Sequence, residues 1–462
     1  MKLRITGVLL AFVCPAFSQT AGSPKGGESG VGADFRKEWT AMKADCGQAK
    51  KFFGCLTDIV TGTPLHLGAG TIAPGNGIAL GPVFGYEHHY KPTNFKDPQT
   101  GAQVSRGRAM RVMGEGAVSP NGSWRAGGYL QLLPYEMRGP VVLEGPPPEP
   151  SRKDAVARTV LQPDITFYGE AVSLQQLHYY GEGQFTPRAN LAYFGLTETI
   201  AGVSARYPVF RGSGLSLFGE VNGRWFDPRS RVGQSNPSIE QRYTEASAPG
   251  LLRSLGYFQA GEGVRWQQWI GTDKLNLNYS AVYRQFVSTS DNRYSFQRFD
   301  LDAGHEIPII YRNGKTYDRW GGVELRAMLT TSFTGNGRIV PYFLQPTIGG
   351  SNINGEPMLP SYPDYRFRAP NMMLFRAAVE HALWKKAPIG GVALADYGRV
   401  AMTTDDLAFE HFRHSFAIGF SVRAGGQVAL RFLFAFGGGE GRHTTALLNP
   451  ILFGGVSRPS LF

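Results

Sequence analysis

The chain has 462 residues, of which 42% are hydrophobic, 12% aromatic and 18% charged, and its formal net charge is +11. Lys and Arg are spread along the chain without long runs, which argues against a nucleic-acid-binding protein and favours solvated surfaces beside anionic lipid. The 60 glycines exceed the usual share of about 7%, and this composition suits a β-barrel with many turns and an aqueous lumen.

The first residues have the features of a secretory signal peptide. Lys2 and Arg4 form a basic start, an apolar segment follows, and Ala16-Phe17-Ser18 places small residues where a signal peptidase cleaves. We therefore expect residues 1–18 to be removed before Gln19. No later stretch approaches the roughly 18–20 consecutive apolar residues of a membrane-spanning helix, which leaves a β-barrel or a soluble exported protein.

Residues 19–76 are predicted to form a Gly- and Ser-rich linker followed by a short periplasmic arm. Apolar residues recur on one helical face over residues 34–53, which predicts a short helix. Cys46 and Cys55 follow an oxidising export route, so we expect a disulfide, the alternative being two unpaired thiols. We expect no series of folded periplasmic modules in a segment of this length.

From Gly77 onward the hydrophobic pattern changes to a period of two, and residues 77–462 are predicted to form an outer-membrane β-barrel. In residues 412–424, for example, Phe, Ile and Val occupy one face and mostly Ser, Arg and small residues the other. The segments run to about 10–14 residues, longer than ordinary strands and long enough to cross a bilayer at a tilt. The fold class is therefore all-β, a transmembrane antiparallel barrel, rather than a secreted sandwich.

About sixteen strands are predicted, an even number as in single-chain bacterial barrels. They span residues 77–90, 104–118, 122–136, 158–180, 195–209, 213–226, 254–270, 273–287, 294–309, 319–334, 338–347, 371–384, 388–401, 412–424, 426–438 and 443–454. Long loops lie outside, and with a periplasmic N-terminus this count places connectors 137–157 and 348–370 outside but 227–253 inside. We therefore expect an error of one strand between residues 158 and 226.

The last predicted strand, 443–454, contains Asn449 and Pro450. Proline cannot donate a ladder hydrogen bond, so pairing between the last and first strands is expected to be weak. A weak seam is consistent with a lateral gate and equally with a frayed terminus.

The region 338–442 carries a series of motifs. In order they are Val340-Pro341-Tyr342-Phe343-Leu344-Gln345-Pro346-Thr347-Ile348-Gly349-Gly350, Leu359-Pro360-Ser361-Tyr362, Tyr365-Arg366-Phe367-Arg368, Glu380, Asp396 and Glu440-Gly441-Arg442. This series resembles the bacterial surface antigen barrel, the C-terminal domain of BamA/TamA-type assembly proteins. The resemblance implies a long loop that folds back into the barrel before the last five strands, and a role in outer-membrane protein assembly, insertion or secretion.

The resemblance also implies site residues. The family's loop carries a Leu/Val-Arg-Gly-Phe/Tyr element, but here Pro360 stands where the family has Arg, and Ser361 where it has Gly. Asp396 matches the acidic position that would receive the Arg. Arg366 and Arg368 lie on one face of an extended segment, so either is expected to replace the missing cation and pair with Asp396; alternatively both line a hydrated lumen. The predicted loop and lumen contacts are Tyr362, Arg366, Arg368, Glu380 and Asp396.

No catalytic or metal-binding pattern is recognisable. His88-His89 and His411 with His414 lack the spacing of a zinc site, and no Gly-x-Ser-x-Gly element occurs. We predict neither an enzyme nor a cofactor. The expected partners are outer-membrane lipid and either a periplasmic partner chain or unfolded outer-membrane clients, and the expected location is the outer membrane of a Gram-negative-type cell. The alternatives are a solute-conducting pore and a secreted adhesin or hydrolase.

Overall fold

A computed structural model of the chain describes residues 36, 40, 64–90, 93–96, 103–138, 163–210, 213–271, 274–313, 316–384, 389–424 and 427–448. The predicted signal peptide, the Cys46–Cys55 bridge, and Asn449 and Pro450 lie outside these residues. Within the predicted helix over 34–53, Arg36 and Thr40 are described and are helical. Among the described residues, none of the helices has the length and hydropathy needed to cross a membrane.

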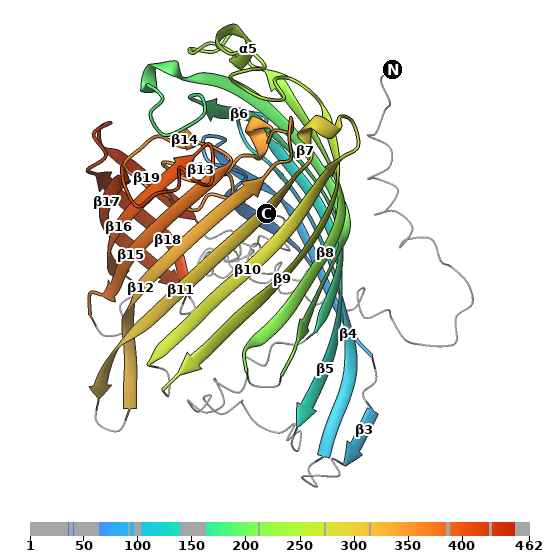
Figure 1. Cartoon of the computed structure of the whole chain (residues 1–462). Coiled ribbons are helices and arrows are strands. Elements are labelled where there is room, and N and C mark those ends of the chain that lie inside the picture. Colours follow the sequence, from blue (N-terminus) through green and yellow to red (C-terminus); the bar gives the residue numbers. More distant parts are fainter. Residues whose placement is uncertain are drawn as a thin grey trace.

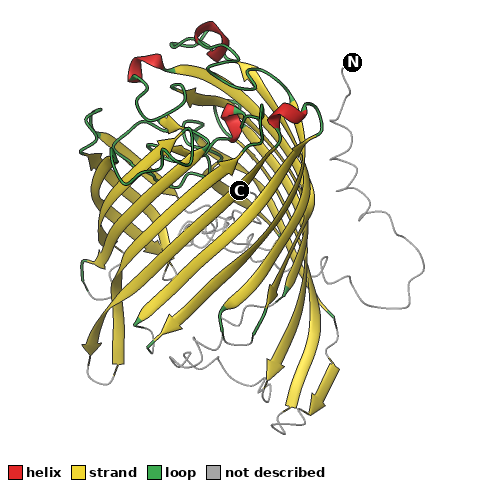
Figure 2. Cartoon of the chain, viewed as in Figure 1, coloured by secondary structure: helices red, strands yellow, loops and turns green. Residues whose placement is uncertain are grey.

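The strands form an antiparallel barrel (Figures 1 and 2). The wall strands are β1 (Leu65–Thr71), β2 (Ile78–His89), β3 (Thr93–Lys96), β4 (Gln103–Val118), β5 (Trp124–Arg138), β6 (Asp164–Tyr179), β7 (Ala192–Pro208), β8 (Leu215–Ser230), β9 (Leu255–Ile270), β10 (Leu275–Ser288), β11 (Phe296–Asn313), β12 (Thr316–Phe333), β15 (Asn371–Ala382), β16 (Ile389–Ala401), β17 (Arg413–Ala424), β18 (Gln427–Phe436) and β19 (His443–Leu448). Because β2 and β3 pair with successive parts of β4, they occupy one position in the wall. The barrel therefore has 16 strands, as predicted.

The pairing follows the order of the chain. Each wall strand is antiparallel to its neighbour. β12 pairs with β15, although a long segment of the chain separates these two strands in the sequence. Antiparallel neighbours joined by short connections need no crossover, so the order in the wall follows directly from the sequence. The remaining elements lie in connectors: η4 (Arg188–Asn190), α5 (Ile239–Arg242), η5 (Asn292–Tyr294), η6 (Tyr342–Leu344), β13 (Thr347–Ile348) and β14 (Phe367–Arg368).

The two faces of the wall differ as the alternation predicts. On β8, Leu217 and Trp225 are 49% and 54% exposed on the outside, whereas Glu220 and Arg224 are 3% and 1% exposed on the inside. The outer face is apolar and the inner face polar, the reverse of a soluble domain. This is the arrangement of a barrel whose wall faces lipid.

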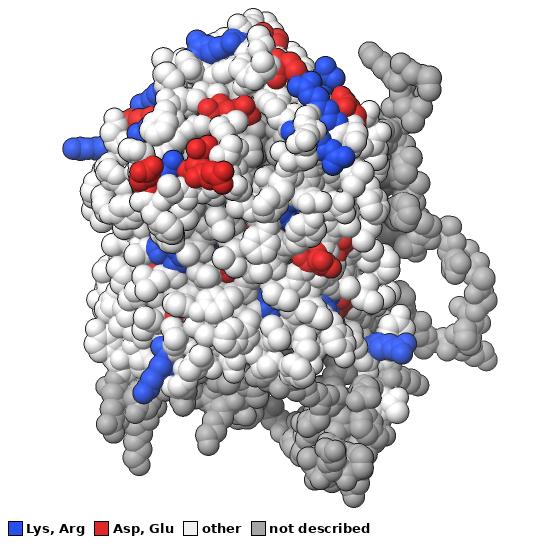
Figure 3. All heavy atoms as spheres, viewed as in Figure 1, with Lys and Arg blue, Asp and Glu red and all other residues white. Residues whose placement is uncertain are grey.

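Aromatic side chains form bands at both ends of the outer surface. At one end of the strands, the end where β8 finishes and β9 begins, lie the exposed Trp124, Trp225, Phe258, Phe333 and Phe436. At the opposite end, where β7 finishes and β8 begins, lie the exposed Tyr207, Phe210, Tyr311 and Trp384. Charged groups gather at the upper end, and the face below is mostly uncharged (Figure 3). Such bands mark the two interfaces of a bilayer.

The described connectors at the two ends differ in secondary structure. We call the upper end in Figure 1 the loop end, because α5, η4, η5 and η6 all lie there, and the opposite end the turn end. The segment from residue 334 to residue 370 joins β12 to β15 at the loop end and is called the inward loop.

Three sequence predictions are wrong. The barrel begins with β1 at Leu65, not at Gly77, because β1 is short and contains Gly68 and Gly70, which weaken the alternation. The predicted strand 338–347 belongs to the inward loop and contains η6, and its two prolines are incompatible with a central strand. Because β1 is added and 338–347 is removed, the number of strands in the barrel stays the same.

The third correction concerns the sides of the loops. With β1 counted, the ends of β5 and β6 that connector 137–157 joins lie at the turn end, while 227–253 and the inward loop lie together at the loop end. The missing strand precedes residue 77 rather than falling between 158 and 226.

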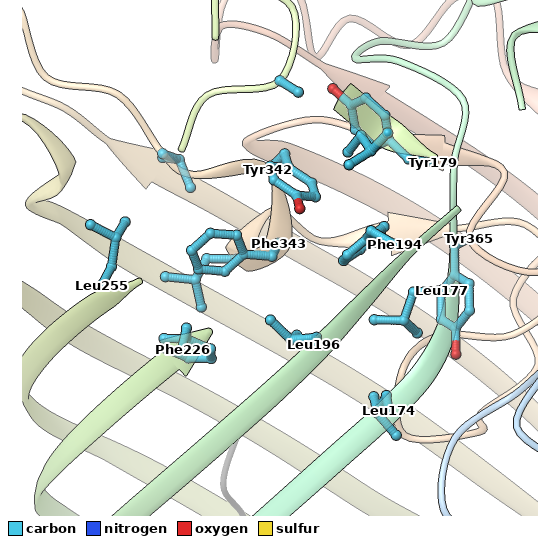
Figure 4. Packing of buried hydrophobic residues seen from close by; sticks show 14 of the residues in the cluster. Leu174, Leu177, Tyr179, Phe194, Leu196, Phe226, Leu255, Tyr342, Phe343 and Tyr365 are labelled. Atoms are coloured by element: carbon cyan, nitrogen blue, oxygen red, sulfur yellow. The ribbon is translucent and has the colours of Figure 1, made fainter. Parts of the chain in front are cut away.

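The inward loop closes the loop end by packing on opposite parts of the wall. Tyr342 of η6 lies against Tyr179 and Phe194, with ring centroids 5.2 and 4.9 Å apart, and Phe343 lies against Phe226 (Figure 4). A second cluster, centred on Ile348 and Phe367, packs on β15 and β16. The loop is thus held by burial of apolar side chains on both sides of the barrel.

Candidate functional site

The inward loop folds into a hairpin that begins at two glycines. Gly349 donates from its backbone N–H to the Met358 carbonyl at 2.8 Å, and Gly350 to that of Leu359 at 3.1 Å. Both glycines have positive φ, and a Cβ on either would lie 2.5 Å from Arg366 or Asp364. Only glycine allows the returning strand of the hairpin to pass this close.

The Leu359-Pro360-Ser361-Tyr362 element lies against the wall at β16 and β17. The N–H of Leu359 donates to Oδ2 of Asp396 at 2.9 Å, and the N–H of Ser361 donates to Oγ of Ser415 at 2.8 Å. Leu359 has a φ of 54°, a left-handed conformation that costs a non-glycine residue about 1 kcal/mol or more. The wall contacts offset this cost and hold the element in place.

The cation beside Asp396 comes from the neighbouring strand and not from the loop. Arg376 on β15 donates from Nε to Oδ1 and from a terminal nitrogen to Oδ2 of Asp396, both at 2.9 Å, and also donates to the Pro357 carbonyl. Asp396 is fully buried. The predicted pairing of Arg366 with Asp396 is therefore wrong: Arg376 already occupies that carboxylate, and Pro360 contributes no charge.

Arg366 binds a different acid. Its Nε lies 2.8 and 3.0 Å from the carboxylate oxygens of Glu440, a terminal nitrogen lies 2.7 Å from Oε1, and a further bond reaches the Thr186 carbonyl at 2.6 Å. The guanidinium lies 4.9 Å from the centre of the Tyr180 ring. Arg366 is 2% exposed, so this is a buried, bidentate ion pair between the inward loop and the β18–β19 connector.

Arg368 and Glu380 also lie apart from Asp396. Arg368 donates to the Tyr342 carbonyl and lies over the rings of Tyr179 and Phe194, so it joins the two arms of the inward loop. Glu380 lies on β15 and accepts bonds from Arg423 and Arg431.

Tyr362 packs at the base of the same connector that holds Glu440. Its ring lies 5.0 Å from that of Phe367, and a Cβ on Gly438 would lie 2.6 Å from its ring. The predicted residues thus divide into loop contacts, Tyr362, Arg366 and Arg368, and wall contacts, Asp396 and Glu380.

Asp364 lies in the turn that precedes these contacts. Burial raises the pKa of its carboxyl group from 3.8 to about 6, although hydrogen bonds from Ser351 oppose the shift. The hairpin of the inward loop therefore contains an acid that titrates in the mildly acidic range.

The β1–β2 turn, residues 72–77, folds inward and is fixed by Asn76. Its side-chain amide donates to the Gln176 carbonyl at 2.9 Å, and its Oδ1 accepts from the Gln176 N–H at 3.1 Å and from Ser123 Oγ at 2.8 Å. Gln176 lies where the β6–β7 register shifts, between Leu174 and Leu177. Asn76 thus satisfies backbone groups that a β-bulge leaves unpaired.

The first and last strands meet at a seam that the described residues leave without a ladder. β1 pairs with β2, and β19 pairs with β18, but no ladder links β1 to β19 within the described parts of the two strands. Above this seam, Tyr365 donates from its hydroxyl to the Pro74 carbonyl at 3.0 Å, while the adjacent Arg366 holds Glu440. Two consecutive residues of the inward loop therefore bind the connectors on either side of the seam.

Several charged side chains on the lumenal face of the wall are held in ion pairs. Arg224 binds Glu198 on β7 and Gln259 on β9, and Arg326 binds Asp302 on β11 and Glu356 of the inward loop. Buried charges need partners of this kind. A cavity of about 30 Å³ remains between β6, β7 and Ile353 of the loop, which is room for about one water.

The sequence reasoning missed Glu440, Arg376 and Tyr365 as contact residues. Glu440 stands in the glycine-rich Gly437-Gly438-Gly439-Glu440-Gly441 run, and an isolated acid in such a turn was the available signal. No such signal exists for Arg376, because arginines are common on the lumenal face of a barrel. The described part of the chain contains no group of three or more His, Cys, Asp or Glu residues placed to hold a metal ion.

Comparisons with known proteins give matches of structure alone. No family model and no curated protein sequence matches the chain. Among solved structures, BamA from Haemophilus ducreyi lacking POTRA domains 1–3 aligns with 83% of this chain and 69% of its own, at 11% identity and a TM-score of 0.48. CdiB from Escherichia coli aligns at 13% identity and a TM-score of 0.44, covering 83% of this chain and 61% of its own. For CdiB from Acinetobacter baumannii the identity is 10% and the TM-score 0.40, with 76% and 56% covered. This chain thus spans less than two thirds of either CdiB chain.

Proposed function

We propose that the protein is an outer-membrane barrel of the surface-antigen type that acts in the assembly, insertion or secretion of outer-membrane proteins. The observation that carries the proposal is the seam between β1 and β19, where the described residues form no ladder while the loop end above is packed shut. The motif series in residues 338–442 supports the same assignment. The partners that we propose are outer-membrane lipid and unfolded clients or a periplasmic partner chain.

The mechanism that we propose is a seam that opens sideways. The unpaired edge of a β-strand can pair with another extended chain, and hydrocarbon offers no hydrogen bonds to such an edge, so opening in a bilayer favours pairing with a new strand. The inward loop would control the opening, because Tyr365 and Arg366 connect the two sides of the seam.

Depletion of the protein in its host tests the role. If the proposal is right, the levels of other outer-membrane proteins fall when this protein is depleted, and expression of the wild-type chain restores them. Unchanged levels would contradict the assembly role but would not contradict the barrel fold.

Hydrogen exchange on the purified barrel in lipid vesicles tests the control of the seam. Glu440→Gln removes the charge that Arg366 binds, and a hydrogen bond to a charged group contributes about 1.5–3 kcal/mol, so exchange in β1 and β19 should rise about tenfold or more. Asp300→Asn is the matched control, because it weakens the Arg284–Asp300 pair on β10 and β11, away from the seam. Exchange that rises equally around the whole barrel would contradict a contact specific to the seam.

A solute pore is the alternative, and the packed loop end argues against it. Tyr342, Leu359 and Phe367 of the inward loop are buried completely, so free diffusion through that end requires the loop to move. A secreted soluble protein is tested by fractionation, since it would appear without detergent.

A further inference from the structure

A carboxyl group lies on the outer, lipid-facing surface of the barrel, on β9. Glu262 pairs with Gly219 of β8 on one side and Tyr283 of β10 on the other. It shares the outward face of β9 with Phe258 and Val264, which are 50% and 44% exposed, and it is itself exposed. The side chain therefore points away from the lumen.

Its depth corresponds to the middle of the membrane. On the same face of β9, Glu262 lies midway between Phe258, in the aromatic band at the loop end, and Trp266. The indole of Trp266 donates at 2.8 Å to the Ser213 carbonyl in the β7–β8 turn, which fixes the position of the turn end. A strand rises about 3.3 Å per residue, so Glu262 is about 13 Å along the strand from either aromatic residue, near the centre of an apolar band about 25 Å tall.

Glu262 has no partner among the described residues, unlike the lumenal acids. Glu198 binds Arg224, and Glu220 accepts from Tyr168 and Asn222, whereas no hydrogen bond or ion pair with another described residue involves Glu262. Ionisable groups inside a membrane are costly, and they usually face a partner. A lone carboxyl group at this depth lowers the stability of the barrel by itself.

The surface beside Glu262 has room for a second molecule. A Cβ built on Gly219 meets no atom within 4 Å, so the position next to the carboxyl group is open. Leu217 and Val221, 49% and 43% exposed, frame it on β8. Small residues at such a position let another backbone approach closely.

We propose that Glu262 and the open position at Gly219 form a docking site within the membrane for another membrane-embedded protein that presents a Lys or Arg side chain at the same depth. The charge of the carboxylate selects a cation, and the surrounding apolar surface selects a membrane-spanning partner. This inference concerns the outer face of β8–β10 and does not depend on an assembly function.

Two measurements test it together. In vesicles, Glu262→Leu should unfold about tenfold more slowly than the wild type, because it removes an unpaired polar group from hydrocarbon; Val264→Leu is the matched control on the same face. In native membranes, a photo-reactive residue at Val221 should form an adduct that Glu262→Leu abolishes and Glu262→Asp retains, and the cross-linked peptide should contain a membrane-embedded Lys or Arg. A photo-reactive residue at Ile418, exposed on β17, should give no such adduct.

Several outcomes overturn the proposal. They are an adduct indifferent to Glu262, the absence of any adduct, an adduct with a second copy of this chain, or a Glu262→Leu barrel no more resistant to unfolding than the wild type. The unfolding measurement needs no partner, so it decides whether the carboxyl group is in lipid even when the adduct is weak.

Discussion

At the scale of the residue, the effect of a buried charge on the stability of the fold depends on whether it has a partner. Asp396→Asn would leave the guanidinium of Arg376, 8% exposed, facing a neutral amide, with Glu356 as its next acid at 3.6 Å. Breaking a buried pair in this way costs about 3–5 kcal/mol. We expect Asp396→Asn to lower the temperature at which the folded, heat-modifiable band is lost on a gel.

The matched control is an ion pair of the same type in a more exposed place. Glu87 and Arg111 are bound at 2.6 Å with side chains 32% and 42% exposed, and such pairs contribute about 0–1 kcal/mol. Glu87→Gln should leave the transition nearly unchanged. Equal effects of the two substitutions would show that Arg376 finds water or another acid when Asp396 is neutral.

The partner of Arg366 shows what sequence reasoning cannot reach at this scale. The sequence indicated a loop arginine and an acidic strand position, and the simplest pairing joined them. The actual partner, Glu440, lies in a different connector, and only the folded path of the inward loop brings the two together. Contacts between loops depend on three-dimensional positions that hydrophobic periodicity does not encode.

At the scale of the element, the wall strands were predictable because lipid and lumen impose opposite demands on alternate residues. Predicted segments 412–424 and 426–438 differ little from β17 and β18. Leu433 of β18 is an apolar residue on the inward face, and it is fully buried there in a small apolar cluster. Segment 338–347 misled the prediction because a loop buried inside a barrel is as apolar as a strand.

The hairpin of the inward loop is expected to respond to pH. The pKa of Asp364 is raised from 3.8 to about 6 by burial, so between these values the folded state binds more protons than the unfolded state. Stability must then fall as pH rises through about 4 to 6. The protection of residues 349–365 from hydrogen exchange should decrease over this range in the wild type.

Asp364→Asn supplies the comparison. The amide keeps the shape of the side chain without the titrating proton, so exchange in residues 349–365 should depend less on pH than in the wild type. Parallel pH profiles for the two proteins would mean that a different group controls the hairpin.

The backbone groups of the bulge in β6 are hydrogen-bonded by a single side chain, that of Asn76. Asn76→Ala would leave the N–H and carbonyl of Gln176 without the bonds that Asn76 provides. Each buried, unsatisfied backbone group costs about 1–3 kcal/mol. We expect lower thermal stability and faster amide exchange at residues 175–177, while Asn276→Ala, which removes one bond to Glu306 at 3.2 Å, should change little in β6.

At the scale of the whole molecule, the barrel is a nearly closed wall with one end filled by its own chain. The inward loop packs on β6–β9 and on β15–β16, and its Glu356 binds Arg326 on β12. A plug held on several sides moves as a unit or stays in place, because packed interiors deform little. The same contacts that close the lumen therefore also hold the connectors beside the seam.

Conductance in planar bilayers measures this closure directly. The wild-type barrel should conduct little, and deletion of residues 351–368 should produce larger and steadier currents, because it removes the hairpin with Tyr362, Tyr365 and Arg366. Deletion of residues 403–406, exposed at the loop end in the β16–β17 connector, removes a loop segment without touching the lumen and should leave the current low. Equal currents from the wild type and the 351–368 deletion would contradict a plugged barrel and would favour the solute pore.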